Sequence, residues 1–250
     1  MLIEIASVPF EAVLRYPHTE LFFRGYETDK PPLFTVEPTE ADLVKVQADI
    51  DAAAVRGGEK PVRRTPSSLE FHAVHALLAR KLISYNVLLM HGSALAIDGE
   101  AIVFTAKSGT GKSTHARLWR EAFPDRVRMI NDDKPLIRIE DGRALVYGSP
   151  WNGKHHLGMN ACAPLKAVVF LSRGEKNAIT PVSRADAFPA LVKQCLSSVD
   201  PMTAGKILEL EMKLLNEAAF FGLQCSMSPE AALVAYEGIM NEPTARPCDK

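Results

Sequence analysis

The residues with the clearest chemistry lie in the segment FTAKSGTGKSTHARLW, residues 104–119. This segment follows the phosphate-binding pattern G-x-x-x-x-G-K-[S/T], except that Ala106 stands where the pattern has its first glycine. Alanine adds one methyl group, which the backbone tolerates when its φ angle is negative. An apolar strand is expected before the loop and a helix after it, an order in which backbone N–H groups and the positive helix end converge on a phosphate. The segment therefore predicts a nucleotide phosphate site, and a chance turn rich in glycine and serine is the alternative.

The individual loop residues have roles that follow from their types. Gly109 and Gly111 can adopt conformations that a side chain forbids, while Lys112 can reach the β- and γ-phosphates and Ser113 can offer its hydroxyl to Mg²⁺. The expected cofactors are ATP and Mg²⁺. The residues expected to contact ATP are Ser108, Gly109, Thr110, Gly111, Lys112, Ser113 and Thr114.

Asp132 and Asp133 end the apolar strand VRMIN, 19 and 20 residues after Ser113. One carboxylate there can help Ser113 hold Mg²⁺, and the other can accept a proton from a hydroxyl in line with the γ-phosphate. This pairing predicts phosphoryl transfer to an alcohol, with Lys112 stabilising the transferred phosphate. Which aspartate is the base stays open, and a solvated turn is the alternative for both.

The elements that must position these residues follow from hydrophobic periodicity and turn signals. Helices are expected over 39–55, 67–85, 112–123, 184–198, 202–219 and 229–241. Strands are expected over 1–8, 21–26, 87–91, 93–97, 101–105, 127–131, 135–140, 144–148, 165–173 and 220–225. Asp98 to Glu100 and Asp141 with Gly142 are expected to form tight hairpin turns. The pattern predicts an α/β fold with a mixed sheet.

Length and composition bound the protein class. The 250 residues, of which 47% are hydrophobic, can bury a sizeable core, and we expect an N-terminal α+β extension over 1–64, a P-loop domain over 65–241 and a loose tail over 242–250. A formal net charge of −1 argues against nucleic acid or an anionic membrane as partner. No apolar run is long enough to span a bilayer and the start lacks a secretory signal, so a cytoplasmic location is expected.

Three segments together resemble the HPr kinase/phosphorylase and PEP carboxykinase-like group of P-loop proteins, in an uncharacterised bacterial branch. They are HGSALAIDGEAIVFTAKSGTGKST, NDDKPLI and GSPWNGKHHLGMNACAPLKAVVFL, and the resemblance covers roughly residues 86–240. It implies the core fold of that group and suggests assembly into a homo-oligomer. Some proteins of this branch are associated with the modification of ribosomally made peptides.

The resemblance implies a kinase that moves the ATP γ-phosphate to a serine hydroxyl. By matched position, one of Asp132 and Asp133 would be the base and the other would help hold the metal, with His91 near the reacting phosphate. A satisfied, partly buried histidine is the alternative for His91. The expected acceptor is a small protein, a peptide or a metabolite that carries a hydroxyl.

The chain departs from this group between Asp141 and Glu175, where it has no acidic residue. The group's E-I-R-G-x-G segment, which supplies a metal-binding glutamate, is replaced by LVYGSPWNGKHH, so neither a second metal ligand there nor recognition of HPr itself is implied. This segment suits a polar or anionic acceptor, and an ordinary loop with a buried tryptophan is the alternative. The expected substrate-binding residues are Trp151, Asn152, Lys154, His155 and His156.

Two other functions fit the same motifs. The first is a phosphorylase or carboxykinase-like enzyme on the same scaffold, and the second is an ATP-binding regulatory module without turnover. A GTPase or transporter ATPase is disfavoured because the chain has neither NKxD nor LSGGQ.

Overall fold

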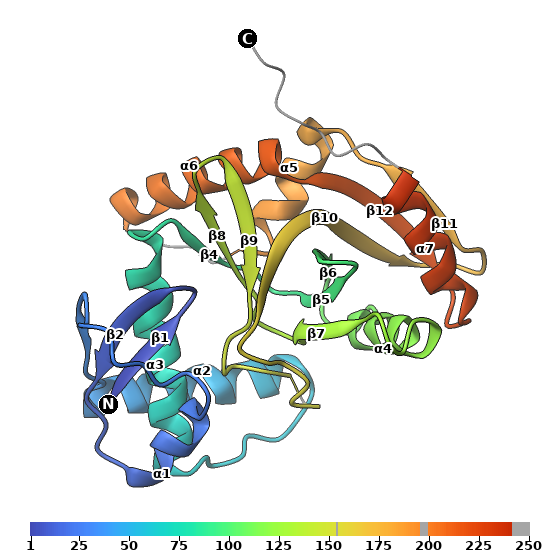
Figure 1. Ribbon diagram of the computed structural model, residues 1–250. Helices are drawn as coiled ribbons and strands as arrows, with labels where there is room; N and C mark the ends of the chain where they lie inside the picture. The colour runs from blue at the N-terminus through green and yellow to red at the C-terminus, as the bar shows by residue number, and fades with distance from the viewer. Residues whose placement is uncertain (154, 196–199, 242–250) are drawn as a thin grey trace. The chain divides into compact units, whose positions relative to one another are not determined.

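The computed structural model describes residues 1–153, 155–195 and 200–241 (Figure 1). Lys154, the last residues of the helix expected over 184–198, and the tail expected over 242–250 lie outside the described residues. The chain divides into two compact units, Met1–Leu82 and Ile83–Lys250. This division falls near the end of a helix, later than the loop in which the sequence places it. No helix in the described part of the chain is both long and apolar enough to cross a membrane.

The first unit combines a small sheet with helices. Strands β1 (Leu2–Ile5), β2 (Val8–Ala12) and β3 (Thr35–Val36) form a three-stranded sheet. Helices α1 (Pro17–Glu20), α2 (Glu40–Arg56) and α3 (Pro66–Ile83) accompany it. Thr39 caps α2, because its side chain accepts from the backbone N–H of Asp42 and the Asp42 carboxylate accepts from that of Thr39.

The strand expected over 21–26 is wrong. Residues Leu21–Phe23 form a 3₁₀ turn that directly continues α1, whose helical start is set by Pro17 at its first turn. Phe23 is fully buried while Leu21 is 50% exposed and Phe22 44% exposed. The three apolar residues in a row therefore reflect one buried anchor and not the alternating faces of a strand.

The second unit is built on a nine-stranded mixed sheet, seven of whose strands follow the order β4-β8-β9-β10-β6-β5-β7. These strands are β4 (Val87–Leu89), β5 (Ser93–Ile97), β6 (Glu100–Thr105), β7 (Arg128–Asn131), β8 (Leu136–Glu140), β9 (Arg143–Tyr147) and β10 (Cys162–Arg173). The other two, β11 (Ala178–Pro181) and β12 (Ala219–Cys225), continue from β10 through β12. The long β10 pairs in parallel with β6 and β12 and antiparallel with β9, which confirms the expected mixed α/β fold.

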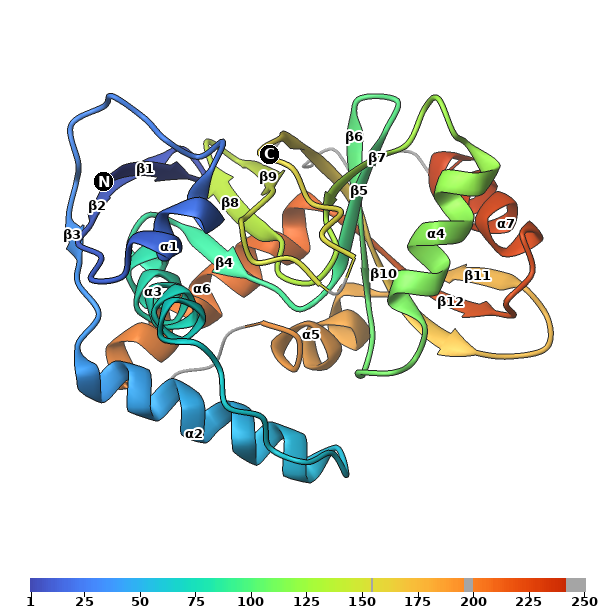
Figure 2. The same cartoon turned by 90° about the horizontal axis from the view of Figure 1, so that it is seen from below.

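Helices cover both faces of this sheet (Figures 1 and 2). Helices α4 (Lys112–Ala122) and α7 (Glu230–Asn241) share one core cluster, whereas α5 (Arg184–Val192) and α6 (Pro201–Glu217) share the other. Neighbouring residues of β10 divide between the clusters, with Val168 in the second and Val169 in the first. The strand is thus apolar on both faces, which explains its unbroken hydrophobic sequence.

The sequence located two turns but missed strands β2, β3 and β11. The strand expected over 1–8 ends at Ile5, because Ala6 and Ser7 form a turn with positive φ angles. β11 pairs only with β12 and is mostly exposed, so it lacks the apolar pattern of a buried strand. The turns at Asp98–Gly99 and Asp141–Gly142 are confirmed, because all four residues have the positive φ angles that a two-residue hairpin turn requires.

Candidate functional site

The phosphate-binding pattern forms the connection between β6 and α4. Gly109 has a φ of 80° and Gly111 a φ of 123°, both in the region that a side chain disfavours. Ala106 is not among the residues with positive φ and is only 8% exposed. The alanine therefore meets the condition under which it can replace the first glycine of the pattern.

Two basic side chains stabilise the loop from opposite ends. The Nζ of Lys112 donates to the Ala106 carbonyl at 2.8 Å, and its side chain is largely buried. Burial lowers the pKa of Lys112, Asp133 opposes this shift, and Lys134 adds to it. Arg173, the last residue of β10, donates to the carbonyls of Gly109 at 2.5 Å and Thr110 at 3.3 Å.

Strand pairing collects the other candidate residues beside this loop. β5 is antiparallel to both β6 and β7, so Ser93 at its start pairs with Phe104 near the end of β6, and Ala94 pairs with Asn131 at the end of β7. His91 lies just before β5, the phosphate loop follows β6, and Asp132 and Asp133 follow β7. The antiparallel pairing therefore brings them to one edge of the sheet. Gly92 lets β5 begin close to β6, because an added Cβ would lie 2.9 Å from the Phe104 carbonyl oxygen.

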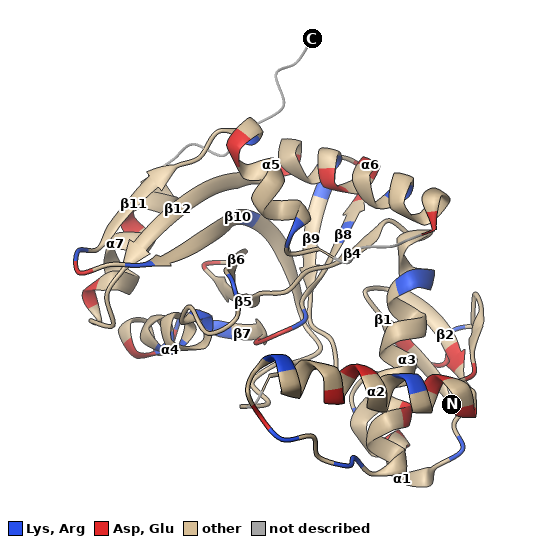
Figure 3. Ribbon diagram, turned by 180° about the vertical axis from the view of Figure 1, so that it is seen from behind, with Lys and Arg blue, Asp and Glu red and all other residues tan. Residues whose placement is uncertain are grey.

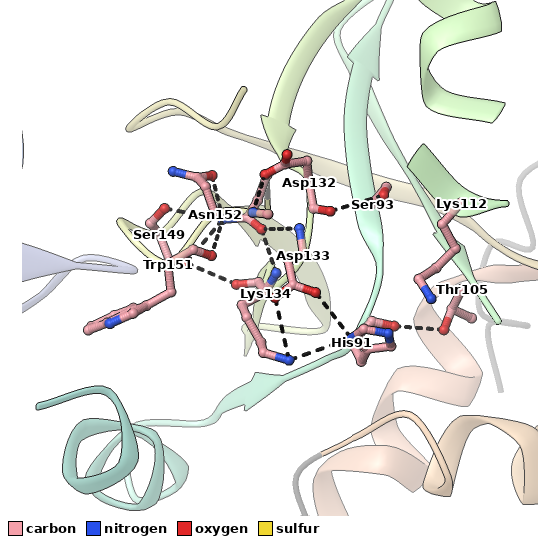
Figure 4. A network of polar contacts seen from close by, with 12 residues as sticks. His91, Ser93, Thr105, Lys112, Asp132, Asp133, Lys134, Ser149, Trp151 and Asn152 are labelled. Atoms are coloured by element: carbon pink, nitrogen blue, oxygen red, sulfur yellow. Dashed lines mark hydrogen bonds and ion pairs between the residues drawn. The ribbon is translucent and has the colours of Figure 1, made fainter. Parts of the chain in front are cut away.

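Asp133 lies within reach of His91 and Lys134 (Figure 4). The His91 Nδ1 is 3.3 Å from Asp133 Oδ1 and 3.5 Å from the Nζ of Lys134, which in turn is 3.7 Å from Asp133 Oδ2. Burial raises the pKa of Asp133, but the hydrogen bond from His91 and the charges of Lys134, His91 and Lys112 outweigh it, so the pKa lies below its ordinary value. Asp133 is therefore held as a carboxylate at neutral pH.

Asp132 has a different environment. It is 6% exposed, and its Oδ1 accepts from the backbone N–H of Gly153 at 2.6 Å. A Cβ at Gly153 would lie 3.0 Å from Asp132 Oδ2, so the backbone approaches the carboxylate as closely as a glycine allows. The two adjacent aspartates thus face different partners: Asp132 contacts the loop after β9, and Asp133 contacts His91 and Lys134.

Asn131, which was not among the expected site residues, connects these parts. Its fully buried side chain accepts from the backbone N–H groups of Asp133 at 2.8 Å and Lys134 at 2.5 Å. Its Nδ2 lies 3.1 to 3.3 Å from acceptors on Ser149, Trp151 and Asn152. Such a side chain shapes both the turn that presents the aspartates and the loop beside them. The asparagine that precedes the double aspartate was the available signal.

A cavity of about 450 Å³ brings most of the expected site residues together. Its wall is formed by His91, Ser108, Gly109, Gly111, Lys112, Ser113, Thr114, Asp132, Asp133, Gly153 and His155. Thr110 does not line this cavity and lies instead beside a neighbouring one. The phosphate loop, both aspartates and the histidine before β5 therefore share one space.

The expected substrate-binding loop contributes unevenly to this cavity. Of the four expected residues that the structure describes, only His155 lines it. Trp151 is 5% exposed, and Figure 4 shows its ring pointing away from the two aspartates. Asn152 accepts from Asn131 at 3.2 Å, and His156 is an exposed residue with a φ of 50°. Lys154 lies outside the described residues.

The oxygen donors of the cavity fit a magnesium ion. Ser113 offers a hydroxyl, and Asp132 and Asp133 offer carboxylates. Mg²⁺ prefers such hard oxygen ligands, and usually takes only one or two from protein, with water and substrate phosphates completing its shell. Among the described residues no three His, Cys, Asp or Glu side chains form a metal-binding group.

Known proteins offer two similarities. A comparison with solved structures finds the HPr(Ser) kinase/phosphatase from Coxiella burnetii, with 9% sequence identity, a TM-score of 0.37, and coverage of 61% of this chain and 96% of that one. A comparison with curated protein sequences gives no match. The model of the family described as SynChlorMet cassette protein ScmC matches residues 63–228. Since this match spans more than half of the chain, the protein belongs to the ScmC family.

Proposed function

We propose that this protein is a Mg²⁺-ATP-dependent kinase that transfers the γ-phosphate to a hydroxyl group, with a serine of a peptide or small protein as the favoured acceptor. The observation that carries the proposal is the single cavity that holds the phosphate loop, His91 and both aspartates. A loop alone would support binding. Two carboxylates with different surroundings beside it supply what transfer to an alcohol needs in addition.

The two aspartates are assigned different tasks from their contacts. Asp132 is the base, because its carboxylate is held by Gly153, in the loop that also brings His155 into the cavity. Asp133 serves the phosphate side, because it contacts His91 and its charge interacts with Lys112. Its lowered pKa keeps it ionised, which suits a ligand for a cation better than a proton acceptor.

The transfer step follows from these positions. The acceptor oxygen attacks the γ-phosphorus while Asp132 takes the hydroxyl proton, and the bond between the γ-phosphorus and the bridging oxygen breaks to release ADP. Lys112 exchanges its contact with Ala106 for the phosphate oxygens and stabilises their negative charge. Mg²⁺, held by Ser113 and Asp133, would supply further neutralisation of the phosphates when it is bound.

The class of acceptor is inferred from the residues that line the cavity. Of the described residues of the 151–156 loop, Gly153 and His155 line the cavity, and they offer backbone and an imidazole in place of a large apolar surface. A small hydroxyl presented on a flexible segment fits this opening. The resemblance to proteins associated with modification of ribosomally made peptides favours a peptide.

The aspartate assignment can be tested with γ-labelled ATP and a peptide library in which the candidate acceptor position is serine, threonine or alanine. We expect Asp132→Asn to lower label transfer about 10²–10⁴-fold, because the base is lost, while Mg²⁺-ATP binding by calorimetry stays close to that of the parent protein. We expect Asp133→Asn to weaken Mg²⁺-dependent ATP binding itself.

Asp141→Asn is the matched control, because this exposed aspartate lies in a hairpin turn where asparagine is equally suited. Full label transfer by both Asp132→Asn and Asp133→Asn would contradict the mechanism. Tight ATP binding by the parent protein, with no transfer to any library member or to water, would indicate a regulatory module instead.

A further inference from the structure

A second cavity of about 490 Å³ adjoins the phosphate cavity. It shares the loop residues Gly109, Gly111 and Thr114 with the first cavity, and it extends along α4 to Leu118. Its far side is formed by the segment that follows β12, including Met227. The nucleotide-binding loop is thus bordered by two distinct spaces, and the site described above uses only one.

The walls of the second cavity are apolar and almost uncharged. Leu118, Cys225 and Met227 contribute carbon and sulfur surface. Burial lowers the pKa of His115 to about 4 and raises that of the Cys225 thiol, so both side chains are neutral near pH 7. Neither aspartate of the phosphate cavity lines it, and Arg173 is its charged residue. Such a space suits a flat, neutral ligand group and provides no base for phosphoryl transfer.

The order of groups along the loop indicates which part of a nucleotide would enter. In phosphate loops of this pattern, the lysine reaches the β- and γ-phosphates while the loop backbone cradles the α- and β-phosphates. Here Lys112, Asp132 and Asp133 lie in the first cavity, so the γ-phosphate end belongs there. Thr114 faces both cavities, which places the α-phosphate end of the chain at the opening of the second.

We propose that the second cavity binds the nucleoside of the nucleotide, with the base against Leu118 and Met227 and the Arg173 guanidinium at its rim. This inference rests on the proposed function, since it takes the loop to bind a nucleoside triphosphate. Arg173 is already fixed by its bonds to the Gly109 and Thr110 carbonyls, so its planar group is available to stack on a base at little entropic cost.

Cys225 provides a direct test, because it is a free, half-buried thiol in the cavity wall. The full-length protein is alkylated with iodoacetamide at mildly alkaline pH, and the labelling rate of each cysteine is followed by mass spectrometry. At a concentration about ten times its Kd, Mg²⁺-ATP should slow the labelling of Cys225 about tenfold, because only about a tenth of the protein molecules then have an empty cavity. Mg²⁺-tripolyphosphate, which lacks a nucleoside, should leave its rate unchanged. Cys162 is exposed and lines neither cavity, so it reports any general effect.

A pair of matched variants tests the wall itself. Met227 is 77% exposed, so its truncation should leave the fold intact. We expect Met227→Ala to weaken ATP binding about fivefold by loss of apolar contact, with tripolyphosphate binding unchanged. Met202→Ala is the control, because Met202 is 86% exposed on α6 and lines neither cavity.

The outcomes separate this inference from the function on which it rests. Binding of ATP without protection of Cys225, or equal protection by tripolyphosphate, overturns the nucleoside assignment and leaves the kinase proposal standing. If calorimetry shows that neither ATP nor tripolyphosphate binds, both proposals are wrong.

Discussion

At the scale of single residues, the His91 Nδ1 faces two partners with which it cannot bond in the same way. It can donate a proton to Asp133, or it can accept one from the Lys134 ammonium, since both atoms lie within 3.5 Å. The bonding role of this nitrogen therefore depends on which of the two partners it contacts. Lys134 was not among the expected site residues, and its position after the double aspartate is the feature that could have indicated it.

Removal of the Lys134 charge should change the pH dependence of the enzyme. In Lys134→Met the pKa of Asp133 rises toward its ordinary value, because one of the cations that stabilise the carboxylate is lost. The acidic limb of the kcat/KM profile should then move to higher pH. The stability that Asp133 contributes above its ordinary pKa, and loses as pH falls through its folded-state pKa, should also decrease.

Lys134→Arg should restore most of the parental profile, because it restores the positive charge. Lys45→Met removes an exposed lysine of α2 and should leave the profile unchanged. An acidic limb that stays in place in Lys134→Met would show that Asp133 does not need this cation.

At the scale of elements, the site depends on how closely the loop after β9 approaches the end of β7. Gly153 is the contact point, since its backbone N–H donates to one oxygen of Asp132 and an added Cβ would lie 3.0 Å from the other. Asn131 holds the same two segments together from within. The position of Asp132, the proposed catalytic base, is therefore set by the packing of the 149–153 loop against the end of β7 and not by β7 alone.

A methyl group at Gly153 should disturb this packing selectively. In Gly153→Ala the new Cβ would lie 3.0 Å from Asp132 Oδ2 and 3.3 Å from the Asp132 carbonyl oxygen, so the carboxylate must shift by a few tenths of an ångström. We expect label transfer to fall about tenfold, because catalytic groups tolerate little misplacement. Nucleotide binding should change much less.

The same substitution elsewhere serves as the control. Gly205 lies inside α6, and a Cβ there would meet nothing within 4 Å. Gly205→Ala should therefore raise the free energy of unfolding by about 0.5–1 kcal/mol through helix propensity and leave transfer unchanged. Equal activity of the two variants would mean that Gly153 does not position Asp132.

At the scale of the whole molecule, the candidate site belongs to the second compact unit. Both large core clusters of the described chain draw only on residues from Ile83 onward. Every residue of the phosphate cavity and of the second cavity also belongs to this unit. Figure 3 marks both acidic and basic residues along α2 of the first unit and α6 of the second, in line with the near-zero net charge.

Nucleotide binding should stabilise one unit selectively. At a concentration about 100 times its Kd, Mg²⁺-ATP is expected to add about 2.7 kcal/mol to the free energy of unfolding of the unit that binds it. Amide hydrogen exchange should show this gain at the core amides of β6 and β7, while the amides of β1 and β2 in the first unit stay unchanged. An equal gain in both units would show that they unfold together.

The sequence by itself determined the features whose causes are local. The phosphate loop follows from two glycines with positive φ between a strand and a helix, and the hairpin turns follow from aspartate–glycine pairs. The mixed α/β class follows from apolar runs and their turn residues. The replacement of the first glycine by Ala106 could also be judged from the sequence, because it requires only that the φ angle of this residue is negative.

The tertiary structure alone decided how these pieces combine. That β5 lies between β6 and β7 is a matter of long-range pairing, and it is this register that brings His91, the loop and both aspartates to one edge. The contacts of Asn131 with the 149–152 loop, of Gly153 with Asp132 and of His91 with Asp133 join segments by packing that no local pattern encodes. The same packing buries Trp151 and points its ring away from the two aspartates. Because burial depends on the whole fold, the sequence could not show that this residue lies outside the cavity wall.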